Sequence, residues 1–401
     1  MFLGKINKPG GIKMTQVHFT LNLEEIQNLI DVEVKDNIAK SILTKVFNQL
    51  MEKERDEYLD NEAYQRDPNR MTYRNGYYNR DYTTKLGTLN LRVPRTRDGK
   101  FSTEIFERYQ RNEKALLLTM LEMYIQGVST RKVSKVIENL CGKTYSKSFV
   151  SSLTKQLDEE VRQWRHHDLS SVQYAYLVVD VIYIKVRENH KVVSKACHIA
   201  IGISEEGKRR LLGFDISDGE SDYSWSRFFN YLKERGLNGL KMVISDAHTG
   251  LVKAIKENFL NVSWQRCQVH FLRNILAKIP KKETREFKED IKALFRIQDI
   301  KIARIVKNEL FKKYEGEKKY QASLAILDEG FEDAFTYLNE SVVHPRLKST
   351  NCLERLNEEI RRRERVIRIF PNVESAYRLI GAMLIDQDEE WLTADRIYIQ
   401  M

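Results

Sequence analysis

The sequence predicts an α/β protein in which a mixed sheet carries helices on its faces. The first observation is a series of three short apolar segments, at residues 176–186, 196–203 and 210–216, each bounded by turn or charged residues. The second is the alternation of helical patterns with two further apolar segments, at 240–245 and 262–267. Three strands followed by helix, strand, helix, strand and helix give a mixed sheet with helices on its faces.

Helices are predicted where apolar residues recur at spacings of three and four. In the core they are expected at residues 222–235, 251–259, 269–279 and from about 373 to 388. A third observation is the strongly charged helical stretch at 281–340, which is expected to be an all-α insertion into the sheet domain.

The length of 401 residues favours two or three domains, at roughly 150 residues each. The predicted division has six segments: an N-terminal helical module (1–65), a basic tyrosine-rich hairpin region (66–112), a helix-turn-helix-like domain (113–168), the first part of the α/β core (169–280), a helical insertion (281–345) and the second part of the core (346–401).

The overall charge favours an anionic partner. The chain has 67 Lys and Arg against 57 Asp and Glu, a formal charge of +10, and nucleic acid is the first candidate for such a balance. The four cysteines are far apart and form no Cys-x-x-Cys pair, which fits a reduced, cytoplasmic setting. No signal-peptide core and no apolar run of about 18 residues is present, so no membrane segment is expected.

The N-terminal third contains two candidate DNA-binding regions. A helix is expected from residue 23 to about 59, and Gly142 and Ser146 are expected to separate the last two helices at 113–126, 129–140 and 146–164. Three short helices with tight turns are compatible with a helix-turn-helix, whose third helix, with Lys147 and Lys155, would enter the major groove. Helical triplets that bind no DNA are equally compatible with this pattern.

Basic and tyrosine residues alternate between residues 70 and 100. Arginine-rich hairpins with tyrosines suit phosphate contact and base stacking. The candidates for DNA contact are Arg74, Arg80, Arg92 and Arg95. The alternative is a hairpin that is basic and solvated without binding DNA.

Two aspartates mark the predicted sheet as a site. Asp180 lies in the middle of an apolar strand, where a carboxylate is costly unless it is paired, bound to a metal or exposed on an edge strand. Asp246 directly follows the strand at 240–245, at the end of a strand where ligand sites of open α/β sheets gather. If the two strands are neighbours, the carboxylates face each other, and Mg²⁺ or Mn²⁺ would relieve their repulsion.

A third acid is expected from the helix that begins near residue 350. Glu354, Glu358, Arg361 and Arg365 form one stripe of this helix, next to an apolar stripe that can pack on the sheet. Three acids around two metal ions are the apparatus for in-line displacement at a phosphodiester. Arg361, Arg362, Arg363 and Arg365 could then bind phosphates of the substrate strand. A solvated helix face with internal ion pairs is the alternative.

Several motifs in order carry a family resemblance. They are VVD at 178–180, ISDAHTGL at 244–251, WQRCQVHFLRN at 264–274, STNCLERLNEEIRRR at 349–363 and IRIFPN at 367–372. Together they resemble the bacterial insertion-sequence transposases related to the plant Mutator elements, from about residue 70 to the C-terminus. The resemblance implies an RNase H-like catalytic domain with a DDE triad of Asp180, Asp246 and Glu354, interrupted by the helical insertion, with Glu358 as second choice for the third acid.

The resemblance also implies a role for the Cys-x-x-His motif formed by Cys267 and His270. Two such ligands do not make a closed zinc site, so both are expected to pack and to position a DNA strand near the metals. His248 is expected to support the site or to contact DNA.

The expected function is that of a DNA transposase, acting as a homodimer on two paired ends. It would bind the terminal inverted repeats of its element and the target DNA, and would use two Mg²⁺ (or Mn²⁺) ions to nick DNA and to join the released 3′-hydroxyl. A structure-selective RNase H-like endonuclease and a domesticated, non-catalytic DNA-binding regulator are the alternatives. A two-carboxylate glycosidase would leave the positive charge unexplained.

Overall fold

The computed structural model describes residues 35–60, 72–84, 87–103, 105, 114–141, 144–280, 284–394 and 396–400. The predicted helix at 23–34 and the predicted helix end at Gly142 lie outside these residues, as do parts of the first and second predicted segments. Among the described residues, none of the helices is long and apolar enough to cross a membrane.

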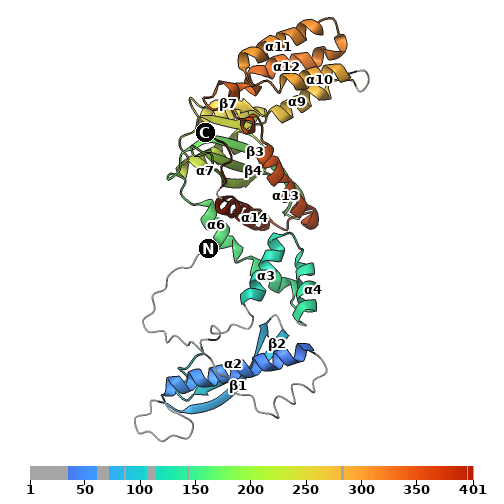
Figure 1. Cartoon of the computed structure of the whole chain (residues 1–401). Helices are drawn as coiled ribbons and strands as arrows, with labels where there is room; N and C mark the ends of the chain where they lie inside the picture. Colours follow the sequence, from blue (N-terminus) through green and yellow to red (C-terminus); the bar gives the residue numbers. More distant parts are fainter. Residues whose placement is uncertain are drawn as a thin grey trace. The chain divides into compact units, whose positions relative to one another are not determined.

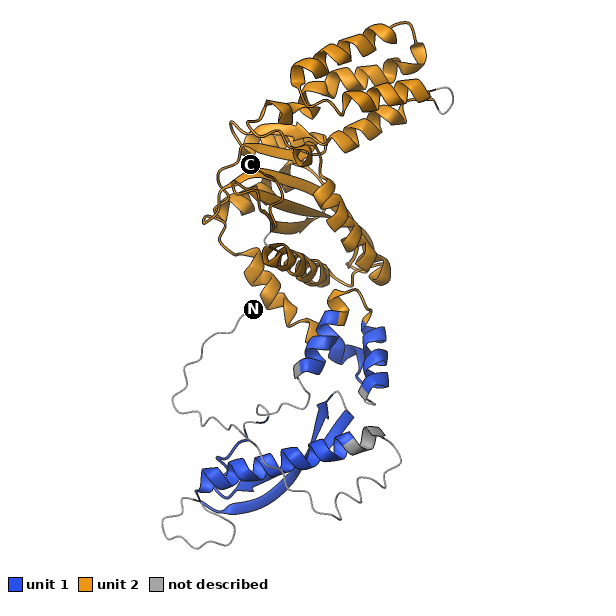
Figure 2. Cartoon of the chain, in the orientation of Figure 1, with its two compact units in different colours: residues 1–122, 130–150 blue, residues 123–129, 151–401 orange. Residues whose placement is uncertain are grey.

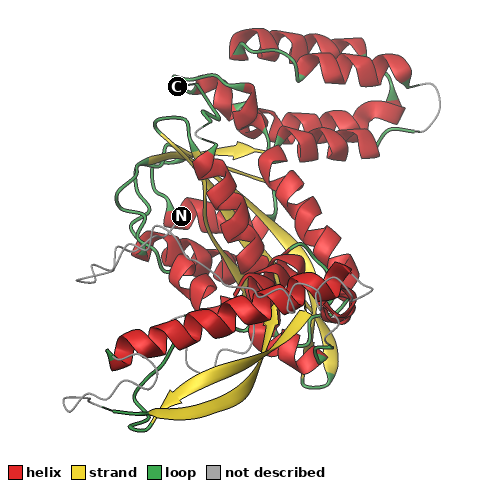
Figure 3. Ribbon diagram, turned by 60° about the horizontal axis from the view of Figure 1, so that its bottom comes forward, coloured by secondary structure: helices red, strands yellow, loops and turns green. Residues whose placement is uncertain are grey.

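The chain forms two compact units (Figure 2), one of residues 1–122 and 130–150 and the other of residues 123–129 and 151–401. In the first unit, helix α2 (Lys35–Leu59) packs on an antiparallel hairpin of β1 (Arg74–Thr84) and β2 (Gly87–Thr96). Figure 3 shows the long helix beside the two long strands. Alternate residues of β2, among them Leu89, Leu91 and Val93, are buried with Met51 of α2, as the period of two in a half-buried strand requires.

Four helices follow where three were predicted. They are α3 (Lys114–Ile125), α4 (Thr130–Cys141), α5 (Lys147–Thr154) and α6 (Leu157–Arg165). Ser146 caps α5 as expected, by accepting from the backbone N–H of Phe149. The single helix predicted for residues 146–164 is wrong, because the chain makes i→i−3 turns at Lys155 and Gln156. There the hydroxyl of Thr154 bonds the carbonyl of Ser151, and such local bonds compete with the helical ladder.

The second unit contains a five-stranded mixed sheet in the order β5-β4-β3-β6-β7 (Figure 1). The strands are β3 (Tyr174–Glu188), β4 (Lys191–Ser204), β5 (Arg209–Ser217), β6 (Met242–Ser245) and β7 (Ser263–Arg266). Strands β3, β4 and β5 form antiparallel pairs, whereas β6 and β7 run parallel to β3. If these five strands are numbered 1 to 5 in chain order, starting at β3, their order across the sheet is 3-2-1-4-5. This is the RNase H-like arrangement, so the predicted fold class is confirmed.

Helices cover both faces of the sheet. Helices α7 (Asp222–Glu234) and α8 (Thr249–Asn258) pack on the face that buries Leu177 and Val179 of β3. The opposite face buries Tyr176, Val178 and Ile182 under α9 (Gln268–Ala277), α13 (Asn351–Ile367) and α14 (Val373–Thr393). Side chains alternate along a strand, so the even-numbered Asp180 lies on the α13 face.

The predicted insertion is helical, with α10 (Arg285–Leu294), α11 (Ile300–Lys313) and α12 (Gln321–Ala334) forming its main body next to α9 (Figure 1). Short 3₁₀ turns at Lys318–Tyr320, Thr336–Asn339 and Pro345–Lys348 complete it. The buried Phe287, Phe331 and Phe335 belong to the same apolar core as the sheet. The insertion therefore supports the part of the chain that leads into α13.

Candidate active site

Asp180 and Asp246 stand side by side on neighbouring parallel strands. Strand β3 pairs with β6 in a register that puts Val178 opposite Ile244, and two further residues along each strand lead to the two aspartates. The predicted adjacency of these strands is confirmed. Asp246 follows the last residue of β6, and its Oδ1 accepts from the backbone N–H of His248 at 3.2 Å, which fixes the turn into α8.

Asp180 is a carboxylate held in a largely buried position. Its pKa is raised to about 6, chiefly by burial; the negative charges of Asp246 and Glu220 contribute to the rise, and the N–H of Val181 and the charge of His270 oppose it. The bond from Val181 N to Oδ1 measures 2.9 Å. Burial, together with the neighbouring carboxylates, therefore disfavours the charged form of Asp180.

Helix α13 reaches Asp180 directly through Asn357. The Nδ2 of Asn357 donates to Oδ2 of Asp180 at 2.8 Å, and Asn357 is only 8% exposed. On the same side of the helix, Leu353, Leu356 and Ile360 are buried, as the apolar stripe predicted. Burying each of these side chains stabilises the packing of α13 on the sheet by roughly 1.5–3 kcal/mol.

Glu354 lies one turn before Asn357 and contacts His270. The Oε1 of Glu354 is 3.4 Å from Nε2 of His270, which comes from the first turn of α9. A hydrogen bond with Cys267 raises the pKa of His270 against the effect of burial, and the charges of Cys267, Asp180 and Glu354 act in the same direction. The charge of His270 therefore interacts with both the first and the third predicted acids.

Cys267 fixes the start of α13 relative to α9. Its buried Sγ accepts from both the backbone N–H and the hydroxyl of Thr350, each at 3.4 Å. Burial alone would raise the pKa of Cys267, but its hydrogen bonds to His270 and Thr350 lower it. The Cys-x-x-His motif thus holds Glu354 through His270 and through the residues that precede the helix.

A fourth carboxylate adjoins the site. Glu220 precedes α7; its Oε1 accepts from the indole Nε1 of Trp225 at 3.1 Å and lies 3.4 Å from Nδ1 of His248. Burial raises the pKa of Glu220 and the charge of Asp246 adds to the shift, whereas Trp225 and His248 oppose it. His248 therefore lies beside Glu220, and its backbone N–H bonds Asp246; its role at the site stays a prediction.

The donor set fits a hard divalent cation at the aspartate pair. Asp180 and Asp246 supply carboxylate oxygens, the ligands that Mg²⁺ and Mn²⁺ prefer, and a cation would stabilise the charged form of Asp180, whose pKa is raised chiefly by burial. In the part of the chain that the structure describes, no three His, Cys, Asp or Glu side chains are already arranged as a metal site. Glu354 is instead turned to His270.

The predicted DNA-contact residues of the hairpin differ in their surroundings. Arg92 lies over the ring of Tyr77, with 4.6 Å from Cζ to the ring centroid, and Arg95 lies over Tyr78 at 4.5 Å. Both arginines are exposed. Arg74 is paired with Asp56 of α2 at 2.9 Å, and Arg80 is half-buried on β1. The exposed cations that face solvent on β2 are thus Arg92 and Arg95.

Lys147 and Lys155 are both exposed, but they do not share one helix. Lys147 is the first residue of α5, and Lys155 lies in the turn between α5 and α6. The predicted recognition helix with both lysines on it is therefore corrected to a shorter helix followed by a turn.

The four arginines of α13 that were predicted to bind phosphates differ in their surroundings. Arg361 and Arg365 are exposed and line a pocket with Arg368, whereas Arg362 is paired with Glu359 at 3.1 Å. Arg363 is buried, and its guanidinium donates to the carbonyl of Ile125 and the side chain of Gln126 at the end of α3. Burial of this kind does not suit the DNA contact predicted for Arg363. Glu358 is exposed.

Sequence reasoning missed Asn357, Glu220 and Thr350. Asn357 and Thr350 act through partners distant in the chain: Asn357 and Asp180 are 177 positions apart, and Thr350 and Cys267 are 83 apart. One signal was available for Asn357, because it falls on the buried stripe of α13 between Leu353 and Ile360. A polar residue at such a position requires a partner.

Comparison with known sequences gives consistent matches. A sequence model of the Mutator family of transposases matches residues 14–394. The chain is 60% identical over 386 residues to the transposase for insertion sequence element IS256 in transposon Tn4001 of Staphylococcus aureus, covering 96% of this chain and 99% of that protein. It is 43% identical over 363 residues to the transposase for insertion sequence element ISRM5 of Rhizobium meliloti, covering 90% of each.

Among solved structures, the Drosophila P element transposase strand transfer complex aligns with 76% of this chain and 84% of its own, at 11% identity and a TM-score of 0.29. That likeness is too low to add to what the sequence relatives show.

Proposed function

The chain belongs to the Mutator family of transposases, and on that premise we propose that it cleaves DNA at the ends of its element and joins those ends to a target. In the first step a water oxygen bonds to the scissile phosphorus and the 3′-oxygen leaves as a hydroxyl. In the second step that 3′-oxygen attacks a target phosphodiester and displaces its 3′-oxygen. One bond to phosphorus forms and one breaks in each step, so no external energy source is required.

The observation that carries this proposal is the pairing of β3 with β6, which puts Asp180 beside Asp246 under a helix that carries Glu354. Two carboxylates side by side with a third on a packed helix are the arrangement that phosphoryl transfer at a metal pair needs. A glycosidase gives no reason for the exposed arginines of the helix that carries Glu354, and a non-catalytic regulator gives no reason for two carboxylates side by side.

Asp180, Asp246 and Glu354 would hold the divalent cations, Mg²⁺ or Mn²⁺, two per site. When bound, such ions activate the attacking oxygen and stabilise the leaving oxygen. Asn357 and Val181 hold the Asp180 carboxylate through one bond to each oxygen. His270 holds Glu354 near the pair, and Glu220 with His248 borders Asp246.

DNA recognition is assigned to the N-terminal third and to α13. We propose that Arg92 and Arg95 of the hairpin, with Arg80, and Lys147 and Lys155 around α5 contact the terminal inverted repeats, while Arg361 and Arg365 of α13 contact the cleaved strand. Two ends must be processed together, so a homodimer on paired ends is expected.

The test uses full-length protein, a labelled duplex with the end of the element, a target plasmid and Mg²⁺. Wild-type protein should yield a nicked strand and then a joined product, and Asp180→Asn and Asp246→Asn should yield neither. Asp218→Asn is the matched control, because Asp218 is 93% exposed and lies on the surface beside Lys195.

Joined products from Asp180→Asn at the wild-type rate would exclude the proposed site. Binding of element ends by wild-type protein without any cleavage in Mg²⁺ or Mn²⁺ would favour the regulator instead. Cleavage of branched DNA in preference to element ends would favour the structure-selective endonuclease.

A further inference from the structure

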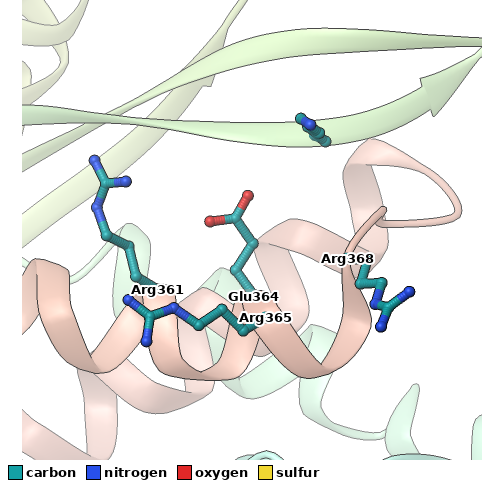
Figure 4. Close-up of a pocket in the computed structure, with 5 residues that line it drawn as sticks. Arg361, Glu364, Arg365 and Arg368 are labelled. Carbon is teal, nitrogen blue, oxygen red and sulfur yellow. The ribbon is translucent and has the colours of Figure 1, made fainter.

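A basic pocket lies between helix α13 and strand β3, away from the acids. It has a volume of about 480 Å³ and is lined by Lys185, Arg361, Glu364, Arg365 and Arg368. This volume lies within the range of roughly 300–1,000 Å³ that is typical of sites for small organic groups. Four cations and one carboxylate give the lining a net charge of +3. Figure 4 shows Arg361 and Glu364 reaching from the helix toward the strand.

Within the described part of the chain, the arginines of the pocket form no salt bridge with a neighbouring acid, although the charge of Arg361 acts on the nearby carboxylate of Glu364. Among the described residues, Arg361, Arg365 and Arg368 form no salt bridge, whereas Arg362 and Arg363 on the same helix are both paired with Glu359. The carboxylate of Glu364 accepts from the backbone N–H of Lys185. Glu364 therefore satisfies the open edge of β3, and the guanidinium groups keep hydrogen-bond donors available for a ligand.

The pocket is held in place at both ends of the β3–α13 pair. At one end Asn357 bonds Asp180. At the other end, the chain turns after α13 at Arg368, whose φ is 64°. Phe370 then pairs with β3. Its N–H donates to the carbonyl of Lys185, and its carbonyl accepts from the N–H of Arg187, each at 2.8 Å. The helix and the strand thus run together from the acids to the pocket.

The spacing from the acids can be estimated from both elements. Lys185 is five residues beyond Asp180, about 16 Å along a strand. Arg361 and Arg368 are seven and fourteen residues beyond Glu354, about 10 and 21 Å along a helix. At about 3.4 Å of duplex axis per nucleotide, these distances correspond to roughly three to six nucleotides.

We propose that this pocket binds a non-scissile backbone phosphate of the DNA strand that is cut, about three to six nucleotides from the cleaved bond. The proposal rests on the proposed function only for the identity of the strand. Guanidinium groups with free donors are suited to phosphate oxygens, and the contact carries no sequence information. It fixes the register of the strand relative to Asp180, Asp246 and Glu354.

The test measures binding of an element-end duplex by fluorescence anisotropy, without divalent metal, so that it is independent of cleavage. Single phosphates along the cut strand are replaced one at a time by uncharged methylphosphonates. Wild-type protein should lose affinity, roughly threefold or more, at one or two positions within the predicted window. The double variant Arg361→Gln/Arg365→Gln should bind more weakly overall and should not respond to those substitutions.

The salt dependence gives a second measure. The slope of log K against log salt should fall by about 1 for each phosphate that the protein no longer binds, thus by about 1 for the double variant, which loses the one phosphate held in the pocket. Arg362→Gln is the matched control, because Arg362 is exposed on the same helix but is paired with Glu359. It should keep both the wild-type slope and the wild-type methylphosphonate pattern.

An equal response of the wild type and of the double variant to methylphosphonates at every position overturns the proposal. A wild-type response confined to positions outside the window overturns it too, and that measurement needs no variant to fold. Position-dependent binding with no cleavage in Mg²⁺ or Mn²⁺ leaves the pocket in place and rejects the proposed reaction. Normal cleavage by wild-type protein that binds all the methylphosphonate duplexes equally rejects the pocket alone.

Discussion

The amide of Asn357 donates a 2.8 Å hydrogen bond from its Nδ2 to Oδ2 of Asp180. This bond joins the helix that carries Glu354 to the strand that carries the first predicted acid. Each oxygen of the Asp180 carboxylate thus has one partner, because Oδ1 accepts from the backbone N–H of Val181. The position of Asp180 therefore depends on the packing of α13.

Replacing Asn357 by Ala should slow nicking by roughly 10- to 100-fold, as is typical when a group that orients a metal ligand is removed. The carboxylate of Asp180 would lose one of its two fixed bonds, so more Mg²⁺ should be needed for half-maximal activity. The measurement is the nicking rate as a function of Mg²⁺ concentration. Asn351→Ala, at the exposed first residue of the same helix, should behave as wild type. Equal losses in both variants would contradict a positioning role.

The third acid can be assigned by comparing two glutamates on one helix. Glu354 contacts His270, whose charge also acts on Asp180, whereas Glu358 is exposed. Glu354→Gln should abolish nicking and joining, and Glu358→Gln should retain rates within a few-fold of wild type. Both variants remove one charge and keep the side-chain size. Retained cleavage by Glu354→Gln together with loss in Glu358→Gln would assign the role to Glu358.

The sequence allowed the sheet and the aspartate pair to be predicted, because both follow from local patterns. Apolar runs of strand length locate β3 and β6, and the end of β6 locates Asp246. The contacts of Asn357 and of Arg363 could not be predicted in this way. Each depends on which residue of a distant element lies opposite, and a run of four near-consecutive arginines does not reveal that one is buried while its neighbours are exposed.

The break between α5 and α6 was missed for a different reason. Apolar residues recur across residues 146–164 at helical spacing, yet Ser151, Ser152 and Thr154 offer the backbone local alternatives to helical bonds. The spacing of apolar residues shows which side of a helix is apolar, but it does not reveal a turn of two residues between two helices. Such a turn changes the direction of the chain without changing the pattern.

Divalent cations should stabilise the folded protein even without DNA. Binding at Asp180 and Asp246 removes the repulsion that contributes to the raised pKa of Asp180, and a ligand at 100 times its Kd adds about 2.7 kcal/mol to the free energy of unfolding. Thermal unfolding in increasing Mg²⁺ or Mn²⁺ should show a rising Tm in wild type. The rise should be absent in Asp246→Asn and present in Asp218→Asn. Identical rises in all three proteins would place the ions elsewhere.

Stability should fall below neutral pH through His198. This residue is 1% exposed between the sheet and α7, and its pKa is lowered to about 4, chiefly by burial; the carboxylate of Asp215 opposes the shift and Arg227 contributes to it. Because the folded pKa lies below the usual 6.5, the unfolded chain binds the extra proton between pH 6.5 and 4. Stability is thus complete above pH 6.5 and is lost as the pH falls toward 4, by about 3 kcal/mol.

The check is the free energy of unfolding measured from pH 4 to 7.5 by urea. His198→Gln removes the titrating imidazole. The free energy of unfolding of this variant should therefore fall by about 3 kcal/mol less than that of wild type between pH 7.5 and 4. His166→Gln, an exposed histidine at the end of α6, should follow wild type. If His198→Gln keeps the full wild-type slope, the loss arises from other groups.

Arg92 and Arg95 should contribute more to DNA affinity than Arg74. Both are exposed on β2 and lie over tyrosine rings, which hold the guanidinium groups in place for phosphate contact, whereas Arg74 already pairs with Asp56. Arg92→Ala/Arg95→Ala should reduce the salt slope of binding to element ends by about 2, and Arg74→Ala by less than 1. Binding is measured by anisotropy at several salt concentrations. Equal slopes for the double variant and wild type would show that this strand of the hairpin does not contact DNA.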